Sequence, residues 1–82
     1  MNYYQQQILK VTGCETGETA EIENLMRTVF FSKYPHNGCL DGLSARSFNA
    51  GAKKALEFKR FLETPEGIEM SARIEREILG EI

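Results

Sequence analysis

Apolar residues recur at α-helical spacing in three long stretches of this chain, and each stretch is bounded by residues that start or end helices. The stretches cover residues 16–31, 44–62 and 65–79. The first has the most regular apolar stripe, which consists of Ile22, Leu25, Met26, Val29 and Phe30. Because such a stripe must be buried against other elements, we expect three amphipathic helices that pack together.

The N-terminal segment adds a shorter helix. Residues 3–12 carry apolar side chains at helical spacing, and Gly13 follows where a left-handed residue commonly ends a helix. A strand over residues 7–12 is the alternative, because half of these residues are β-branched. We favour the helix. The chain is then an all-α protein, a small bundle of about four helices with one long loop.

The long loop covers residues 32–42 and precedes the third helix, residues 44–62. It contains one proline and two Asx-Gly pairs, which are turn residues, and it is longer than most connections in a small bundle. Either Asp41 or Ser44 caps the helix that follows. The predicted apolar face of that helix consists of Ala45, Phe48, Ala52, Ala55, Leu56, Phe58 and Leu62. Phe61 points away from this face.

The last helix has a wider apolar face than one neighbour can cover. Thr64, Pro65 and Glu66 signal its start, as a cap, a first helical residue and an acid in the first turn. The apolar residues that follow are Ile68, Met70, Ala72, Ile74, Ile78, Leu79 and Ile82. They cover more than half of the helix circumference. We therefore expect this helix to lie in a groove between two others, or to bury part of the face against a partner chain.

Length and charge limit the functional classes. The chain has 82 residues, which suits one domain over residues 1–82. Its net charge of −2 argues against a polyanion as the partner of the whole molecule. No apolar run approaches the ~20 residues of a membrane span, and the N-terminus lacks the pattern of a secretion signal. We expect a cytoplasmic protein whose two cysteines are reduced thiols.

Cys14, His36 and Cys39 are the residues whose chemistry suits metal binding or nucleophilic catalysis. Thiolate and imidazole groups bind zinc, but a structural zinc site needs four ligands, so Asp41 would have to complete the set. A Cys–His nucleophile would need a third residue to orient the base, for which the sequence shows no motif. We interpret the three residues as a loop histidine and free thiols. We expect no enzymatic activity, no metal and no cofactor.

Charge is segregated along the second half of the chain. Residues 44–62 contain five Lys or Arg and one Glu, whereas residues 63–82 contain six Glu and two Arg. Arg46, Lys53 and Arg60 recur every seven residues and form a basic stripe beside the apolar face. This basic stripe could bind phosphates or an acidic protein. The alternative, which we favour for most of these charges, is that the basic helix complements the acidic helix within the fold or simply presents a solvated face. A helix-turn-helix built from the first two helices is disfavoured, because its reading helix would carry four Glu.

Aromatic and aliphatic residues away from the main stripes predict a protein-binding surface. Such residues are frequent anchors of interfaces, although they could instead complete the core of a small domain. With the basic stripe, the candidate partner contacts are Phe31, Tyr34, Leu40, Arg46, Lys53, Arg60, Phe61, Met70 and Ile74. A protein partner, or a second copy of the chain in a homodimer, fits them better than nucleic acid. We expect no membrane partner.

Five short segments between residues 8 and 55 form a further pattern. In one-letter code they are ILKVTGC at 8–14, AEIENLMR at 20–27, FFS at 30–32, LD at 40–41 and SFNxGAxKA at 47–55. In these segments the chain resembles a group of small, uncharacterised helical proteins carried by plasmids, prophages and integrative elements of proteobacteria. It departs from their pattern at Gly42-Leu43, where a Trp usually follows the Leu-Asp pair. Residues 33–39 also look like an insertion.

The resemblance implies a setting rather than an activity. It carries no catalytic or cofactor residues, but small helical proteins of mobile elements often bind and modulate a host protein, for example to inhibit a defence system. We therefore expect a non-enzymatic, protein-binding accessory factor that acts on a host protein. A small nucleic-acid-binding regulator that uses the basic stripe is the alternative.

Overall fold

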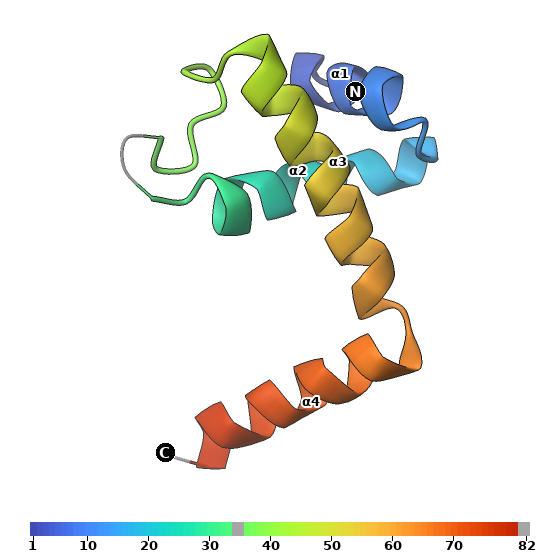
Figure 1. Cartoon of the computed structure of the whole chain (residues 1–82), viewed down its shortest axis with the longest axis vertical. Coiled ribbons are helices and arrows are strands. Elements are labelled where there is room, and N and C mark those ends of the chain that lie inside the picture. Colours follow the sequence, from blue (N-terminus) through green and yellow to red (C-terminus); the bar gives the residue numbers. More distant parts are fainter. Residues whose placement is uncertain (34–35, 81–82) are drawn as a thin grey trace.

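The computed structural model describes residues 1–33 and 36–80, and these residues form four α-helices and no strand. The all-α class predicted from the sequence is therefore confirmed. The helices are α1 (Tyr3–Thr12), α2 (Thr19–Leu25), α3 (Ala45–Leu62) and α4 (Pro65–Gly80). A 3-10 turn, η1 (Thr16–Glu18), precedes α2, and a π-helical turn, η2 (Met26–Phe30), extends it. Figure 1 shows α1, α2 and α3 packed together, with α4 apart from α1 and α2.

The first three helices enclose one small core. Its members are Ile8, Cys14, Ile22, Met26, Leu40, Phe48, Ala52, Ala55 and Leu56. The ring of Tyr4 in α1 lies 6.0 Å from that of Phe48 in α3, measured between centroids. No α4 residue within the described part of the chain belongs to this core. The molecule is therefore a three-helix bundle with one additional helix.

Local hydrogen bonds set both ends of α1. The side-chain oxygen of Asn2 accepts a hydrogen bond from the Gln5 N–H (2.8 Å), and the Gln5 side chain accepts one from the Asn2 N–H (3.3 Å). This reciprocal pair is a capping box. At the other end Gly13 has φ 67°, and its N–H donates to the Leu9 carbonyl. The predicted helix and its glycine end are confirmed, and the strand alternative for residues 7–12 is wrong.

The second predicted helix, residues 16–31, is not one continuous α-helix. It consists of η1, α2 and η2, and the Phe31 N–H donates to the Met26 carbonyl (2.8 Å), five residues back. A π-helical turn holds more residues than an α-helical turn, so it rotates the side chains that follow. Ile22 and Met26 are fully buried as expected, but Val29 and Phe30 are exposed. Their prediction as buried members of the stripe is wrong.

The helix α3 follows its prediction more closely. The Ser44 hydroxyl oxygen accepts a hydrogen bond from the Ser47 N–H (3.1 Å), so Ser44 is the cap and Asp41 is not. Four residues of the predicted face are buried, namely Phe48, Ala52, Ala55 and Leu56. Ala45 is exposed, and Phe58 and Leu62 are half-buried. The last turns of α3 continue beyond α1 and α2, which explains why the face is only partly covered there (Figure 1).

The loop between η2 and α3 packs onto the bundle instead of standing free. Leu40 is 3% exposed and belongs to the core. The Arg27 guanidinium donates to the Gly38 carbonyl (2.8 Å). Phe31 lies against α3 at Gly51, where a Cβ atom would collide with the Phe31 ring. The absence of a side chain at position 51 therefore lets the aromatic ring close over α3.

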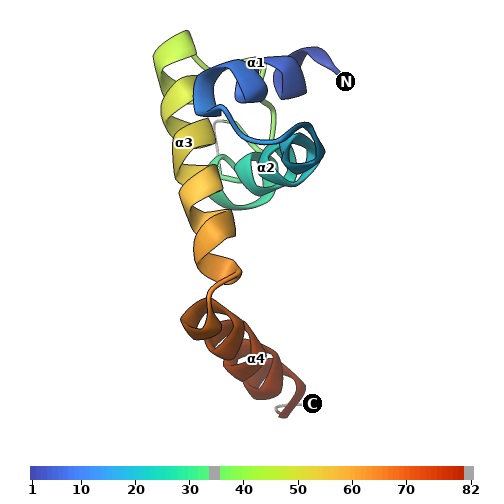
Figure 2. The same cartoon turned by 90° about the vertical axis from the view of Figure 1, so that its right-hand side faces the viewer.

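The corner between α3 and α4 directs α4 away from the bundle. The Thr64 hydroxyl oxygen accepts a hydrogen bond from the Gly67 N–H (3.1 Å), as expected for a cap. Gly67 packs on the backbone of Phe61 and Leu62, where no Cβ atom would fit. Figure 2 shows α4 continuing past the end of α3 rather than folding back. The expectation that α4 lies in a groove between two helices is wrong.

Candidate functional site

Four large apolar side chains of α4 are exposed. Their exposed fractions are 58% for Ile68, 39% for Met70, 48% for Ile74 and 58% for Ile78. At 100° per residue they lie within one half of the helix circumference, so they form a single face. We call these four residues the α4 apolar face. The candidate contacts Met70 and Ile74 lie on it, whereas Ile82 and the Leu79 side chain lie outside what the structure describes.

The other side of α4 is polar and mixed in charge. It carries Glu66, Glu69, Arg73, Arg76 and Glu77. Arg73 forms an exposed ion pair with Glu69 at 3.4 Å, one turn back along the helix. Surface pairs of this kind contribute little to stability, so they do not explain why the helix forms. The helix α4 therefore exposes its apolar side to solvent, and its other side carries charged residues that solvent can hydrate.

The basic stripe of α3 is also free on the surface. Arg46, Lys53 and Arg60 are exposed, and none of them forms an ion pair with another residue in the described ranges. Within the described residues the acidic helix α4 therefore forms no ion pair with them, and the basic stripe is a solvent-exposed face. Phe61, a further candidate contact, is 37% exposed beside the corner with α4.

Lys59 is the basic residue of α3 that does pair. Its ammonium group contacts Glu63, the residue that follows α3, as well as Glu18 at 3.3 Å and Glu21 at 3.4 Å. The hydrogen bond to Glu63 raises the pKa of Lys59, against a smaller opposing effect of burial. The pKa of Glu18 is lowered, first by a hydrogen bond from the Glu15 backbone and then by Lys59. This cluster ties η1 and α2 to α3 and is structural.

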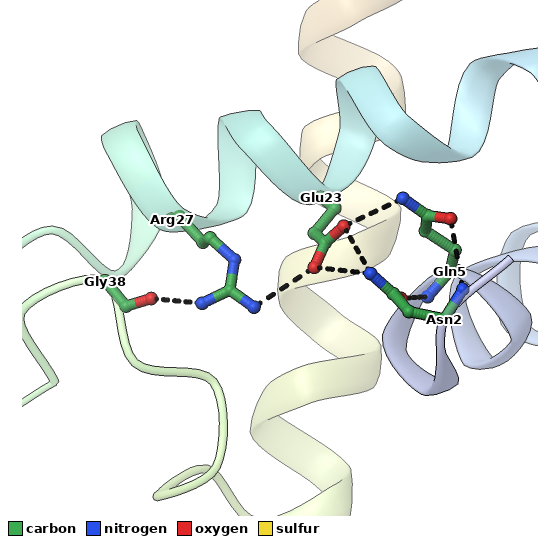
Figure 3. Close-up of polar contacts among 5 residues, drawn as sticks. All are labelled: Asn2, Gln5, Glu23, Arg27 and Gly38. Carbon is green, nitrogen blue, oxygen red and sulfur yellow. Dashed lines mark hydrogen bonds and ion pairs between the residues drawn. The ribbon is translucent and has the colours of Figure 1, made fainter.

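A second polar cluster surrounds Glu23, which is 8% exposed (Figure 3). Its carboxylate accepts hydrogen bonds from Asn2 Nδ2 (3.2 Å), Gln5 Nε2 (3.0 Å) and the Arg27 guanidinium (3.1 Å). Burial raises the pKa of Glu23, but the hydrogen bonds from Asn2, Arg27 and Gln5 together outweigh it, so the pKa is lowered. Arg27 in turn lies over the Tyr4 ring at 5.3 Å. The cluster joins α1, α2 and the loop.

The sequence analysis did not find the Glu23 cluster. One signal was present, because Asn2 followed by Gln5 three residues later matches a capping box. Nothing local connects that pair to Glu23, which is 21 residues from Asn2 along the chain. All the polar side-chain atoms buried in the described residues have partners. The cluster is therefore a satisfied structural network.

A cavity of about 300 Å³ opens between α1, the loop and the start of α3. It is lined by Tyr3, Tyr4, Gln7, Leu40, Asp41, Leu43, Ala45, Phe48 and Asn49. Its volume is at the low end of small-molecule sites, which measure roughly 300–1,000 Å³. Its titratable residues are two tyrosines and one aspartate. The cavity could accept one side chain of a partner.

The remaining candidate residues lie in different environments. Cys14 is buried in the core, Cys39 is exposed, and His36 packs edge-on against Phe31 with centroids 5.9 Å apart. No three His, Cys, Asp or Glu side chains in the described ranges are arranged to hold a metal ion. Leu40 is a core residue, so its prediction as a partner contact is corrected. Phe31 is half-buried, and Tyr34 lies outside the described residues.

Comparison with known proteins gives no relative. No family model matches the chain, and neither does any curated protein or solved structure. Among the helices of the described residues, none combines the length and the apolar character that a membrane span requires. The function must therefore be argued from the surfaces described above.

Proposed function

We propose that the chain is a non-enzymatic, protein-binding accessory factor and that α4 is its contact element. The observation that carries this proposal is the exposed α4 apolar face. Fully burying one Ile or Met side chain contributes about 1.5–3 kcal/mol, and these four are about half exposed, so covering them supplies roughly 4 kcal/mol. An isolated helix of this length is marginal in water, and a partner on the apolar face would stabilise it.

The charge of α4 favours protein over other partners. Its polar side carries three Glu and two Arg, and a fourth acid, Glu75, lies beside the apolar residues. Helices that bind anionic membranes are rich in Lys and Arg on the polar side, and nucleic acids repel carboxylates. An amphipathic helix with exposed anchors commonly binds in an apolar groove or against another helix.

A host protein is the target that the sequence resemblance supports. Residues 8–55 resemble proteins of mobile elements, and such proteins often modulate host factors. In this proposal the bundle holds α4 at a fixed corner, and the basic stripe of α3 adds a contact for an acidic surface. A component of a defence system is one target of this kind.

Affinity capture tests the proposal. The full chain would be used as bait in a proteobacterial lysate with and without nuclease, together with Ile74→Asp and Arg73→Asp. These two variants introduce the same side chain at neighbouring exposed positions, one on the α4 apolar face and one opposite it. We expect nuclease-resistant capture of a protein by the wild type and by Arg73→Asp, and its loss with Ile74→Asp. Equal capture by both variants, or no captured protein, would overturn the proposal.

A nucleic-acid-binding regulator is the second candidate, because Arg46, Lys53 and Arg60 are exposed and have no carboxylate partner in the described residues. Binding to duplex DNA, measured by fluorescence anisotropy, should then weaken steeply with salt. It should be lost when all three residues are replaced by Ala. No binding at low salt would eliminate this candidate.

A further inference from the structure

We propose that the cavity between α1, the loop and the start of α3 binds a nucleotide whose base carries an amino group. The base lies inside the cavity, and the phosphate lies on the neighbouring part of the basic stripe. This inference goes beyond the proposed function, because no described residue of α4 lines the cavity. Three features support it: an aromatic ring with a free surface, polar groups without partners, and two basic residues beside them.

One wall of the cavity is aromatic and consists of Tyr3, Tyr4 and Phe48. The rings of Tyr3 and Tyr4 are 5.7 Å apart between centroids and nearly perpendicular. Phe48 is buried in the core, and the Arg27 guanidinium lies over the Tyr4 ring. Tyr3 is 67% exposed, so its ring keeps a surface that the fold does not use. A nucleobase stacks on an exposed aromatic ring of this kind.

Three polar side chains also line the cavity, the amides of Gln7 and Asn49 and the carboxylate of Asp41. No hydrogen bond or ion pair within the described residues occupies these groups. An apolar occupant would take them out of water without replacing their hydrogen bonds, which is costly. Amides donate and accept along the edge of a base, and a carboxylate accepts from its amino group. The charge of Asp41 also keeps the phosphate outside the cavity.

The basic stripe of α3 begins beside the cavity. Arg46 and Lys53 lie one turn before and one turn after Asn49, within about 60° of it around the helix. Residues at these spacings are roughly 5–6 Å apart between Cβ atoms. Both basic residues are exposed, and Glu57, the acid of α3, lies about 12 Å from Asn49 along the helix axis. A phosphate that one sugar joins to the bound base therefore meets two cations.

The test is a titration of the full chain with adenosine 5′-monophosphate, followed by the amide shifts in NMR spectra. Shifts are expected in residues 3–7 and 40–49, and none in residues 68–78. Adenosine lacks the phosphate and ribose 5-phosphate lacks the base, so each should bind about tenfold or more weakly. Purine riboside 5′-monophosphate, which lacks only the amino group, should also bind about tenfold more weakly. In Asp41→Asn this last difference should fall below about threefold.

Matched variants separate the two halves of the site. Tyr3→Ala should raise the Kd about tenfold, whereas Tyr3→Phe keeps the ring and should stay within about twofold of the wild type. Arg46→Ala should raise the Kd about fivefold. Lys54→Ala removes the same charge from α3 but lies about 140° around the helix from Asn49, so its Kd should change less than about twofold. Circular dichroism shows whether each variant keeps its helices.

A short single-stranded oligoadenylate identifies the source of the nucleotide. Binding about tenfold tighter than that of the monophosphate, with the same dependence on Tyr3 and Arg46, assigns the site to one unit of a strand; equal binding assigns it to the free nucleotide. No shift with either ligand overturns the inference. Binding that Tyr3→Ala leaves unchanged also overturns it, and so does equal binding of ribose 5-phosphate, because the site then recognises only an anion.

Discussion

Replacing Glu23 by Ala should destabilise the bundle strongly. The residue is 8% exposed, and its carboxylate accepts hydrogen bonds from three side chains: Asn2, which caps α1, Gln5 in α1, and Arg27 in η2. Ala removes the acceptor and leaves three donors without their partner. The perturbation is therefore the loss of a link between α1, α2 and the loop, rather than a change in apolar packing.

The magnitude follows from the burial of the partners. One hydrogen bond to a charged group contributes about 1.5–3 kcal/mol, but these three share one acceptor and are not additive. The Arg27 side chain is 37% exposed, so water can replace part of what it loses. We expect a loss of about 2–3 kcal/mol for Glu23→Ala and about 1–2 kcal/mol for Glu23→Gln, which keeps one acceptor oxygen. Each kcal/mol lowers Tm by about 4–8 °C in a domain of this size.

Urea unfolding followed by circular dichroism at 222 nm measures this loss. Glu21→Ala is the control, because Glu21 lies in the same helix and its side chain is 68% exposed. Its one ion-pair partner, Lys59, also pairs with Glu18 and Glu63, so Lys59 keeps two carboxylates in this variant. We expect the control to lose less than about 0.5 kcal/mol. If Glu23→Ala unfolds with the same midpoint and slope as Glu21→Ala, the account of the cluster as a structural link is wrong.

Three further outcomes are expected. The pKa of Glu23 lies below its ordinary value of 4.5. The ionised carboxylate therefore contributes its full stability above pH 4.5, and this contribution is lost as the pH falls through the pKa of the folded state. The urea midpoint should therefore fall more between about pH 5.5 and pH 3 for the wild type than for Glu23→Gln. Gly13→Ala should cost about 1 kcal/mol in thermal unfolding, because φ is 67° there, whereas Gly17→Ala should cost less than half of that. Gly51→Ala should cost about 1–3 kcal/mol, because the new Cβ collides with the Phe31 ring, and a wild-type midpoint would contradict that packing.

Helix positions could be predicted where local signals suffice. Gly13 ends α1, Ser44 begins α3 and Thr64 begins α4, and each acts through its own backbone or a neighbour within a few residues. Caps and glycine ends are properties of short segments, so the sequence shows them directly. The apolar stripe of α3 was predicted for the same reason.

The second helix could not be predicted in detail because its end depends on distant contacts. The π-helical turn places Phe31 over Gly51, 20 positions along the chain, and lets Arg27 reach Gly38. Periodicity assumes a constant rotation per residue, so it cannot register the change at Met26. Leu40 is predicted as a partner contact of the long loop, yet the packed loop buries it.

The candidate site was predicted in part. The excess width of the α4 apolar face is visible in the spacing of Ile68, Met70, Ile74 and Ile78. Whether another helix of the same chain covers that face depends on the angle at the corner. That angle follows from the close packing of Gly67 on the end of α3, which the sequence does not show.

Hydrogen exchange of the α4 amides, with and without the partner protein that the chain captures, tests the central claim most directly. An uncovered helix opens readily and exchanges fast, whereas a covered helix is protected. We predict that protection of residues 70–78 rises when the captured partner protein is added, while protection in the buried part of α3 stays constant. The Ile74→Asp variant should show no such rise. Exchange of residues 70–78 at the same rate with and without that partner would contradict the account of α4 as the contact element.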